Sequence, residues 1–497
     1  MLVKASTKIY NTLMQRTLIK DTVNKVGEEV LIQGWVNIRR DHGKLIFLDL
    51  RDRTGTIQAV VIPQTSPDAH AASQDLRPEF VVEITGKVNA RPEKNINKDF
   101  PTGTVELEVK NVKVLNKAET PPFDVTSDGH EIGEDVRLKY RYLDLRRPRM
   151  QQNLKLRSDY MQALRSALVK RDFVEIETPL LSKATMEGAR DFIVPSRFQP
   201  GKFYALPQSP QQYKQLLMVA GFERYFQFPH CLRDEDLRAD RGFEHTQLDL
   251  EMSFVTREDV MQMVEEVVKE GVKAVGGKLK DETFPVYSYK DAMDKFGADK
   301  FDLRTDEEKK DGTLAFAWVI NFPFFRPVNK NEISDKFDSK SNWTFTHNPF
   351  SMPLPEHVDW LLSGKNIGEI ITTQYDLVCN GLEAGGGSIR SHTPELLKAT
   401  YKIMGYGESQ TQESIGHMLE ALGFGAPPHG GIALGLDRQI ALLKGEGSIK
   451  ETMAFPMTST GRTSVMDAPA SISEDQLKEL GIKVIASDES PSSHKDK

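Results

Sequence analysis

Apolar and polar residues alternate along the first part of the chain. Between residues 105 and 110, valine and leucine alternate strictly with glutamate and lysine, which is the period of a strand with one buried face. Five short strands in succession predict a small closed β-barrel. Besides residues 105–110, the strand-like runs are residues 30–39, 45–50, 56–61 and 80–88, and glycines separate them.

The pattern changes to a helical period after residue 150. Apolar residues at helical spacing predict helices over residues 153–171 and 256–280, and helix and strand then alternate in long stretches. Past about residue 475 the chain becomes rich in Ser, Asp and Lys. We therefore expect an α+β fold in four parts: a barrel domain (1–117), a hinge (118–150), a larger mixed domain (151–475) and a partly disordered polar tail (476–497).

The expected hinge contains a strongly basic run at residues 137–149, RLKYRYLDLRRPR. Such a run is either a contact for RNA or a solvated connector, and the sequence leaves both readings open.

Composition describes an ordinary globular chain. The 497 residues are 39% hydrophobic and 28% charged, and no apolar run is long enough to cross a membrane. Cys231 and Cys379 belong to no paired Cys/His spacing, so a zinc site or a disulfide framework is not expected and a cytoplasmic location is the default.

Charge is unevenly spread along the chain. The net charge is −7, yet residues 1–117 carry more Lys and Arg (18) than Asp and Glu (14). A basic barrel of OB-fold size is compatible with single-stranded nucleic acid, whereas ordinary charge scatter is the alternative.

The common nucleotide and hydrolase motifs are absent. The chain has no G-x-x-x-x-G-K-[ST] loop, G-x-S-x-G elbow or H-E-x-x-H pair. Residues 225–254 instead predict two antiparallel strands joined by a charged loop with Arg233, Arg238 and Arg241. Arginines bind phosphates through bidentate hydrogen bonds, although a solvated loop is the simpler reading.

Two further segments favour phosphate binding over a solvated loop. Residues 425–436 are Gly-rich and predict a turn that enters an apolar helix at residues 440–443, with Asp437 and Arg438 at the junction, and Pro179 closes a strand within residues 171–181. Taken in chain order, these three segments (171–181, 225–254 and 425–438) resemble the three signature motifs of class II aminoacyl-tRNA synthetases.

Longer strings resemble the bacterial type of aspartyl-tRNA synthetases. The resemblance spans nearly all of residues 18–470. The strings are KYRYLDLRR (139–147), EGARDF (187–192), ALPQSPQQYKQLLMVAGFERYFQ (205–227), HNPF (347–350) and YDLVCNGLEAGGGSIR (375–390).

This resemblance implies a fold and an activity. The fold is an N-terminal OB-fold for the anticodon and a catalytic antiparallel sheet flanked by helices, with a homodimer interface around Pro179. The activity is ATP-dependent formation of aspartyl-adenylate from L-aspartate and transfer of aspartate to the 3′ end of tRNA(Asp), with tRNA(Asn) left open as a second acceptor. An enzyme that loads aspartate onto both tRNAs would also imply an amidotransferase partner.

The resemblance also implies site residues, with Arg233 and Arg438 central to catalysis. Those for aspartate are Glu187, Gln211, Lys214, Arg233, Asp249, His347 and Arg390. Those for ATP are Arg233, Asp234, Glu235, Glu383, Gly435, Leu436, Asp437 and Arg438. Asp376 and Glu383 are expected to hold Mg²⁺. The residues expected to contact the anticodon are Asp41, His42, Phe47, Gln58 and Glu106.

Substrate choice is expected to rest on charge, because Lys214 and Arg390 match a clamp for the side-chain carboxylate. Asparagine would leave two buried cations uncompensated, and polar discrimination of this type reaches roughly 10⁴–10⁵-fold. Three rivals remain: an asparaginyl- or lysyl-type synthetase, a non-catalytic RNA-binding paralogue, and an amidotransfer-type asparagine synthetase, whose relatives lack the barrel.

The chain departs from the family pattern in several places. No extra domain separates residues 302–304 from residues 315–318, where bacterial-type relatives have one. Gly242 stands in place of a Gln, Asn348 in place of a second His, and Ile38 in place of an Arg. His42 stands where strictly aspartate-specific readers often have Leu, and it resembles the non-discriminating branch.

Overall fold

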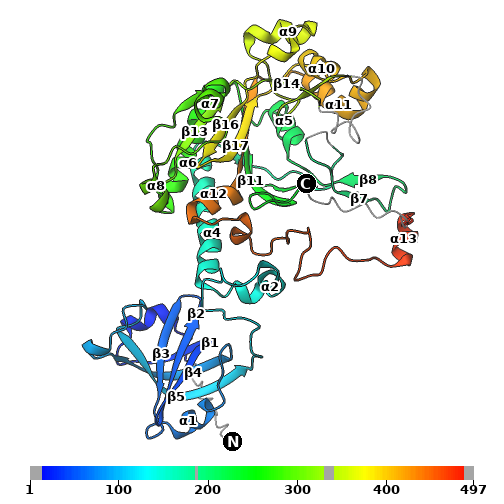
Figure 1. Ribbon diagram of the computed structural model, residues 1–497. Coiled ribbons are helices and arrows are strands. Elements are labelled where there is room, and N and C mark those ends of the chain that lie inside the picture. Colours follow the sequence, from blue (N-terminus) through cyan, green and yellow to red (C-terminus); the bar gives the residue numbers. More distant parts are fainter. Residues whose placement is uncertain (1–13, 185–187, 329–340, 486–497) are drawn as a thin grey trace, which may run out of the picture. The chain divides into compact units, whose positions relative to one another are not determined.

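The computed structural model describes residues 14–184, 188–328 and 341–485. The chain divides into two compact units between Gly129 and His130, and each is described by itself (Figure 1).

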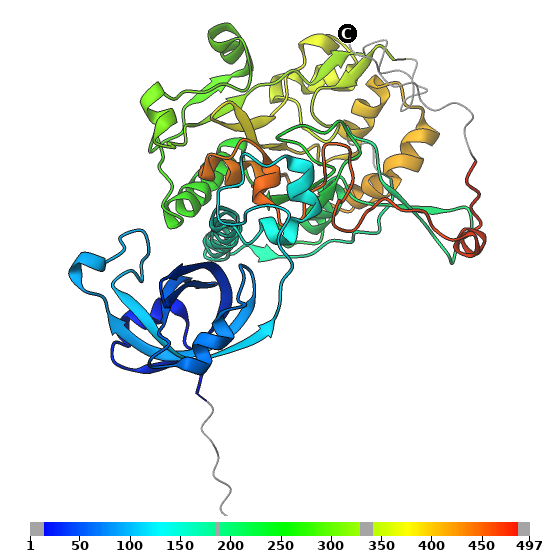
Figure 2. The same ribbon diagram turned by 60° about the horizontal axis from the view of Figure 1, so that its bottom comes forward.

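The first unit is a closed five-stranded barrel with the strand order β1-β2-β3-β5-β4, and Figure 2 shows its strands curving round on themselves. The pairing is antiparallel except where β3 meets β5. Valine, isoleucine and leucine fill the interior because alternate residues of each strand point inward. The predicted barrel is confirmed by β1 (Glu29–His42), β2 (Leu45–Asp52), β3 (Gly55–Val61), β4 (Val81–Ala90) and β5 (Val105–Asn116), with η1 (Ile19–Asn24), α1 (Pro67–Ser73) and η2 (Glu93–Asn95) beside them.

The second unit is built on one large sheet with the order β12-β13-β16-β17-β18-β11-β9-β6, and β10 also pairs with β11. The predicted sheet is confirmed, but two edge pairs, β12 with β13 and β6 with β9, are parallel. The strands are β6 (Val174–Glu175), β9 (Arg224–Gln227), β10 (His230–Leu232), β11 (Glu244–Ser253), β12 (Val286–Ser288), β13 (Phe316–Ile320), β16 (Tyr375–Cys379), β17 (Leu382–Ile389) and β18 (His429–Gly435).

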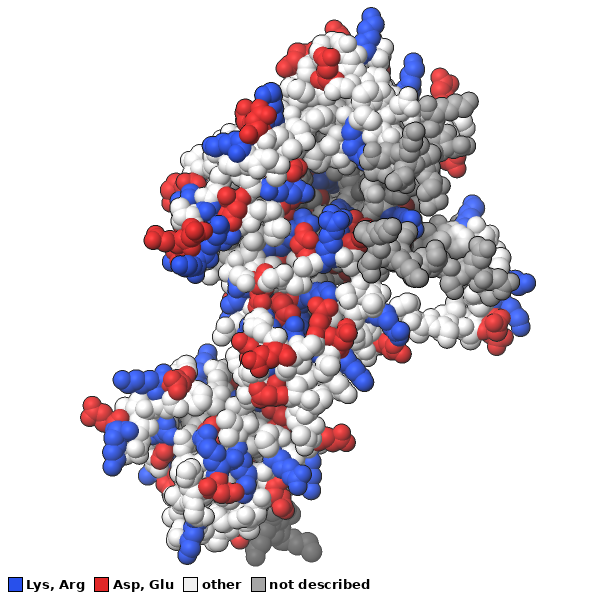
Figure 3. All heavy atoms as spheres, viewed as in Figure 1, with Lys and Arg blue, Asp and Glu red and all other residues white. Residues whose placement is uncertain are grey.

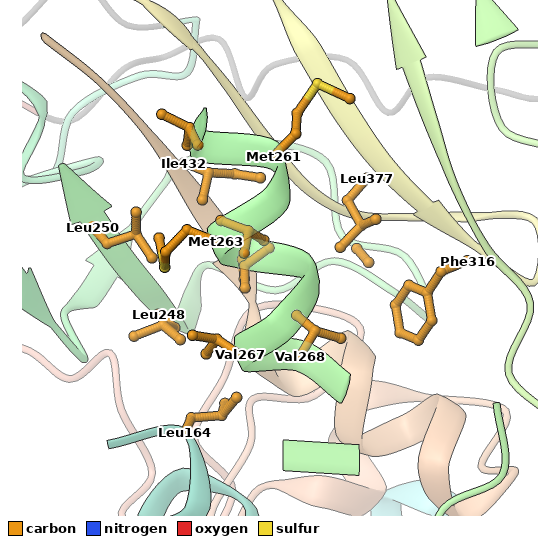
Figure 4. Close-up of a cluster of buried hydrophobic side chains, with 14 of the residues drawn as sticks. Leu164, Leu248, Leu250, Met261, Met263, Val267, Val268, Phe316, Leu377 and Ile432 are labelled. Carbon is orange, nitrogen blue, oxygen red and sulfur yellow. The ribbon is translucent and has the colours of Figure 1, made fainter. Parts of the chain in front are cut away.

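Three helices cover one face of this sheet: α4 (Pro148–Val169), α6 (Arg257–Ala274) and α12 (Leu436–Lys444). Figure 4 shows Met263 and Val267 of α6 lying against Leu248, Leu250 and Ile432 of the sheet. The two long helices predicted from apolar spacing are therefore present. Helix α6 begins where expected because Thr256 and Asp259 form a reciprocal capping box.

Shorter elements surround this framework. Two small hairpins lie apart from the main sheet, β7 (Ile193–Pro195) with β8 (Phe203–Ala205) and β14 (Phe325–Pro327) with β15 (Trp343–Phe345). The remaining helices are α2 (Glu134–Lys139), α3 (Arg141–Asp144), α5 (Gln211–Val219), α7 (Tyr289–Phe296), α8 (Asp306–Lys310), η4 (Pro355–His357), α9 (Val358–Ser363), η5 (Ile367–Glu369), α10 (Pro394–Ile403), α11 (Glu408–Gly423), η6 (Ile449–Thr452) and α13 (Glu474–Leu480). None of the helices in the described ranges has the length and apolarity that a membrane crossing requires.

Three arginines of the basic run at residues 137–149 are buried in ion pairs, so they are neither free to contact RNA nor part of a solvated connector. Arg137 donates to Glu451 at 2.8 and 3.1 Å, and Arg141 and Arg147 bond Asp144 at 2.6 and 2.7 Å with side chains almost fully buried. Buried arginines require such partners because an unpaired buried charge is costly. The run therefore ties the start of the second unit to the segment that follows α12.

Two local predictions differ from the structure. The Gly-rich stretch before Asp437 is the central strand β18, not a turn, although helix α12 follows as expected. Helix α13 crosses the predicted start of the polar tail at residue 476, because Ser473 and Gln476 cap it reciprocally. Residues 486–497 of that tail lie outside the described residues.

Candidate active site

A cavity of about 670 Å³ lies on the sheet face opposite the three helices. Side chains of strand β11 alternate between the two faces of the sheet. Leu248 and Leu250 enter the core, while Gln247 and Asp249 line the cavity. Figure 3 shows basic and acidic side chains gathered around this hollowed face.

Glycines let the central strands beneath the cavity pack closely together. A Cβ on Gly431 would lie 2.0 Å from the carbonyl oxygen of Leu250, and one on Gly387 would lie 2.1 Å from that of Gly431. Any side chain at either position would force β11, β17 and β18 apart. The Gly-rich stretches of the sequence thus serve close packing of central strands.

Four buried charges form one network at the inner end of the cavity. Lys214 Nζ, from α5, lies 2.9 Å from Asp249 Oδ2 and 3.2 Å from Glu251 Oε2. Arg390 donates from Nε and Nη2 to the two oxygens of Glu251 at 2.9 and 3.2 Å, and further bonds reach Ser388 and the Gly431 carbonyl. Two cations and two carboxylates therefore compensate one another.

The network still has groups available to a ligand. Among the described residues, Arg390 uses four of its five N–H groups and Lys214 two of its three. Asp249 Oδ1 is buried without a hydrogen-bond partner. Burial raises the pKa of Asp249 to about 6 against the effect of Lys214, whereas Arg390 and Lys214 outweigh burial at Glu251 and lower its pKa to about 2.

A chain of amides supports Gln211 at the cavity wall. Gln211 donates to Gln215 at 3.0 Å, and the Gln215 amide lies 3.2 Å from His429 Nε2. His429 Nδ1 is 2.7 Å from the Pro427 carbonyl, which can only accept, so Nδ1 carries the proton and Nε2 accepts. Burial lowers the pKa of His429, which favours this neutral form.

Arginines line the outer part of the cavity. Arg233 and Arg241 come from the loop before β11, and Arg438 comes from the first turn of α12. Arg438 donates to the carbonyls of Asp240 and Glu383 at 3.1 Å each, and its Nη2 lies 3.2 Å from the Asp240 carboxylate. This end of the cavity can bind a polyanion.

His245 lines the cavity near these arginines. Burial, and the positive charges of Arg233 and Arg438, lower the pKa of His245 to about 3, so its ring is neutral.

Two acidic residues lie side by side on neighbouring strands, and Glu383 of this pair lines the cavity. Asp376 accepts from Gln374 at 2.8 Å and lies 3.4 Å from His347 Nε2, while Glu383 pairs with Lys300 at 2.7 Å. Burial raises the pKa of Asp376, whereas Lys300 and Arg438 overcome burial at Glu383 and lower its pKa. Two carboxylates of this kind are oxygen ligands suited to a hard divalent cation.

Family comparison matches both units. The model of class II tRNA synthetases (D, K and N) matches residues 133–459, and that of the OB-fold nucleic acid binding domain matches residues 30–115. The chain belongs to the class II tRNA synthetases. The cavity of this synthetase lies wholly within the first of these matches.

Curated relatives cover almost the whole synthetase. The Aspartate--tRNA(Asp/Asn) ligase of Caldanaerobacter subterraneus is 40% identical over 575 aligned positions, which span 93% of this chain and 97% of the relative. That of Corynebacterium aurimucosum is 38% identical, over 94% and 97%. Because 575 positions exceed the 497 residues of this chain, the relative has residues with no counterpart here.

Solved structures share the fold. Asparaginyl-tRNA synthetase from Pyrococcus horikoshii, complexed with asparaginyl-adenylate, has a TM-score of 0.70 at 22% identity and covers 89% of this chain and 98% of its own. Aspartyl tRNA synthetase from Entamoeba histolytica has a TM-score of 0.69 at 23% identity, over 92% and 94%.

The synthetase brings most of the predicted catalytic residues to the one cavity. Glu187 lies outside the described residues. Asp234, Leu436 and Asp376 do not line the cavity, and the Leu436 side chain packs in the core. Those that line it are Gln211, Lys214, Arg233, Glu235, Asp249, His347, Glu383, Arg390, Gly435, Asp437 and Arg438.

Asp437 and Asn348, which both line the cavity, are held by hydrogen bonds to their surroundings. The Asp437 carboxylate accepts from Arg157 and from the Thr246 amide at 2.8 Å, and so fixes the start of α12 against β11. Asn348, which replaces the expected second His, accepts from the Phe350 amide at 3.0 Å and closes its own turn.

The predicted anticodon residues all lie on barrel strands. Asp41 and His42 end β1, and the His42 ring meets Phe47 of β2 edge-on at 5.5 Å. Arg91, which sequence reasoning missed, bonds both Gln58 and Glu106. Three polar residues of the site were also missed: His245, which lines the cavity, and Glu251 and Lys300, which contact Lys214 and Glu383 of its lining. Of these three, only Glu251 is indicated by the sequence, through the alternation of polar and apolar residues along β11.

Proposed function

We propose that this synthetase activates L-aspartate with ATP and transfers it to tRNA. The observation that carries the proposal is the buried network of the cavity. Lys214 and Arg390 each keep an N–H group for a carboxylate, and the unpartnered Asp249 Oδ1 is an acceptor for an ammonium group. The side-chain carboxylate and α-amino group of aspartate match this pattern of donors and acceptor.

The first step joins the α-carboxylate of aspartate to the α-phosphate of ATP, and pyrophosphate leaves. No covalent intermediate with the protein is required, so catalysis consists of positioning and charge neutralisation. Arg233 neutralises charge where carboxylate and α-phosphate meet, and Arg438 binds the terminal phosphate. Arg438 must exchange its contact with Asp240 for that phosphate.

Asp376 and Glu383 suit the Mg²⁺ that accompanies ATP. A Cβ on Gly386 would lie 3.0 Å from Asp376 Oδ1 and 3.6 Å from Glu383 Oε1. The missing side chain thus leaves room where both carboxylates converge. Mg²⁺ held there would neutralise phosphate charge, and two protein carboxylates are a typical complement for an ion that also binds phosphates and water.

We further propose that tRNA(Asp) and tRNA(Asn) both accept aspartate, as the names of the relatives say of those proteins. His42 supports this reading, because it lies against Phe47 on the barrel. A stacked base contributes roughly 1–3 kcal/mol. An amidotransferase would then be needed to convert the aspartate on tRNA(Asn).

Charging of the two purified tRNAs with labelled aspartate or asparagine tests this proposal. We expect aspartate on both tRNAs, with kcat/KM values within about tenfold, and no asparagine on either. As a control, Phe47→Ala should lower kcat/KM for both tRNAs about 10- to 100-fold without changing ATP–pyrophosphate exchange. Charging of tRNA(Asp) alone would refute the relaxed specificity, and charging with asparagine would refute the choice of amino acid.

We propose a homodimer formed through the segment around Pro179. Val174, Leu180 and Leu181 expose 45%, 55% and 53% of their surface, and strand β6 is one of the two edge strands of the main sheet. A second copy of the chain would cover this apolar edge. We expect Leu181→Glu to be monomeric by light scattering and Val26→Glu, an equally exposed barrel position, to remain dimeric. A monomeric wild type would contradict the proposal.

We also place the activity in the cytoplasm. The chain has only two cysteines, and both are buried, as suits a protein of a reducing compartment.

A further inference from the structure

Lys300 contacts one of the two carboxylates of the proposed metal site. Its Nζ lies 2.7 Å from Glu383 Oε2, and the two side chains are 41% and 31% exposed. The neighbouring Asp376 pairs instead with His347 and Gln374. A monovalent cation therefore already lies against a carboxylate oxygen that a divalent ion would use.

The backbone holds Lys300 in this place. The next residue, Phe301, is buried, stacks on Phe296 at 4.1 Å and meets Tyr287 edge-on at 5.3 Å. Its carbonyl accepts from the Gly381 amide at 3.0 Å. Gly381 lies two residues before Glu383, in the turn between β16 and β17. The backbone segments that carry Lys300 and Glu383 are therefore held next to each other.

The two cations exclude each other at Glu383. An ammonium in contact with the carboxylate repels a divalent ion and occupies one of its ligand oxygens. The flexible four-carbon stem of a partly exposed lysine lets the ammonium withdraw when a stronger ligand set arrives. ATP supplies such a set, because its phosphates add oxygen ligands for the metal.

We propose that Lys300 is a built-in counter-ion that competes with the divalent metal for Glu383. It neutralises this carboxylate in the metal-free protein and weakens the binding of metal alone, so that metal enters together with ATP. The inference rests on the proposed function, which takes Asp376 and Glu383 as the metal carboxylates.

Binding of Mn²⁺ without nucleotide tests the inference, with free Mn²⁺ measured by electron paramagnetic resonance on the full chain. We expect Lys300→Gln to bind Mn²⁺ about fivefold more tightly than wild type, the change expected from loss of a partly screened ion pair. Lys300→Arg keeps the charge and should bind like wild type. Lys290→Gln, which breaks a pair between exposed side chains on α7, should also change nothing.

A merely structural lysine would give the opposite sign, because its loss would loosen the site. Equal or weaker Mn²⁺ binding by Lys300→Gln therefore overturns the inference. Glu383→Gln should abolish the Mn²⁺ binding. If neither wild type nor Lys300→Gln shows binding that Glu383→Gln removes, the metal site itself is wrong and the inference falls with it. Charging of tRNA with aspartate is measured separately and decides the proposed function.

Discussion

Replacing Arg390 by alanine is expected to lower aspartate-dependent ATP–pyrophosphate exchange by about 10²- to 10³-fold or more, the effect of truncating one partner of a buried, hydrogen-bonded charge pair. Arg390 is 2% exposed, lines the cavity and is held by both oxygens of Glu251. Its guanidinium is therefore already oriented before a ligand carboxylate arrives. The alanine variant loses the donor and leaves Glu251 with Lys214 alone.

Two controls separate the loss of the clamp from a loss of folding. Arg462→Ala removes an arginine whose side chain is 56% exposed and should leave exchange unchanged. Arg390→Lys keeps the charge but not the bidentate geometry, and should retain a measurable part of the activity. Near-normal exchange by a folded Arg390→Ala variant would contradict the role of Arg390.

The structure also changes the argument for selectivity. The sequence interpretation took Lys214 and Arg390 as two cations that only the substrate neutralises. The structure pairs Lys214 with Asp249 and Glu251, and Arg390 with Glu251. Under the proposed function, discrimination against asparagine would then rest on geometry, because the remaining donors would face the donors of an amide group. Leaving buried donors unsatisfied is costly.

Local patterns predicted the framework of this protein well. The barrel strands follow from period-two alternation, and α6 from apolar spacing that begins at a capping residue. The polar face of β11 was visible in the sequence, because a strand buried on both sides shows alternation when one face is a binding site. These features depend on residues close together in the chain.

Features that depend on distant residues were not predictable in this way. Lys300 meets Glu383 across a long sequence separation, where the Phe301 carbonyl accepts from the Gly381 amide. Arg137 is buried because Glu451 lies beside it. The Gly-rich stretch resembled a turn because close packing of central strands and tight turning both favour glycine. Resemblance to a family supplied residue roles that spacing alone did not.

Replacing Glu251 by glutamine is expected to destabilise the protein by about 3–5 kcal/mol, because it leaves two buried cations with one carboxylate between them. Glu251 is fully buried and contacts both Lys214 and Arg390. Glutamine keeps the shape of the side chain, so the loss reports charge and not packing. Urea unfolding at pH 7 measures it, and Glu258→Gln, where the side chain is 67% exposed, should change stability by less than about 0.5 kcal/mol.

The difference in stability between wild type and Glu251→Gln should depend on pH. Arg390 and Lys214 lower the pKa of Glu251 to about 2, below its ordinary value of 4.5. The contribution of Glu251 is therefore fully present above pH 4.5 and is lost as the pH falls towards 2. The stability gap between wild type and Glu251→Gln should therefore shrink as the pH falls from about 4.5 towards 2. A gap under about 1 kcal/mol at pH 7, or one that does not shrink, would mean that Glu251 is not the counter-ion of the clamp.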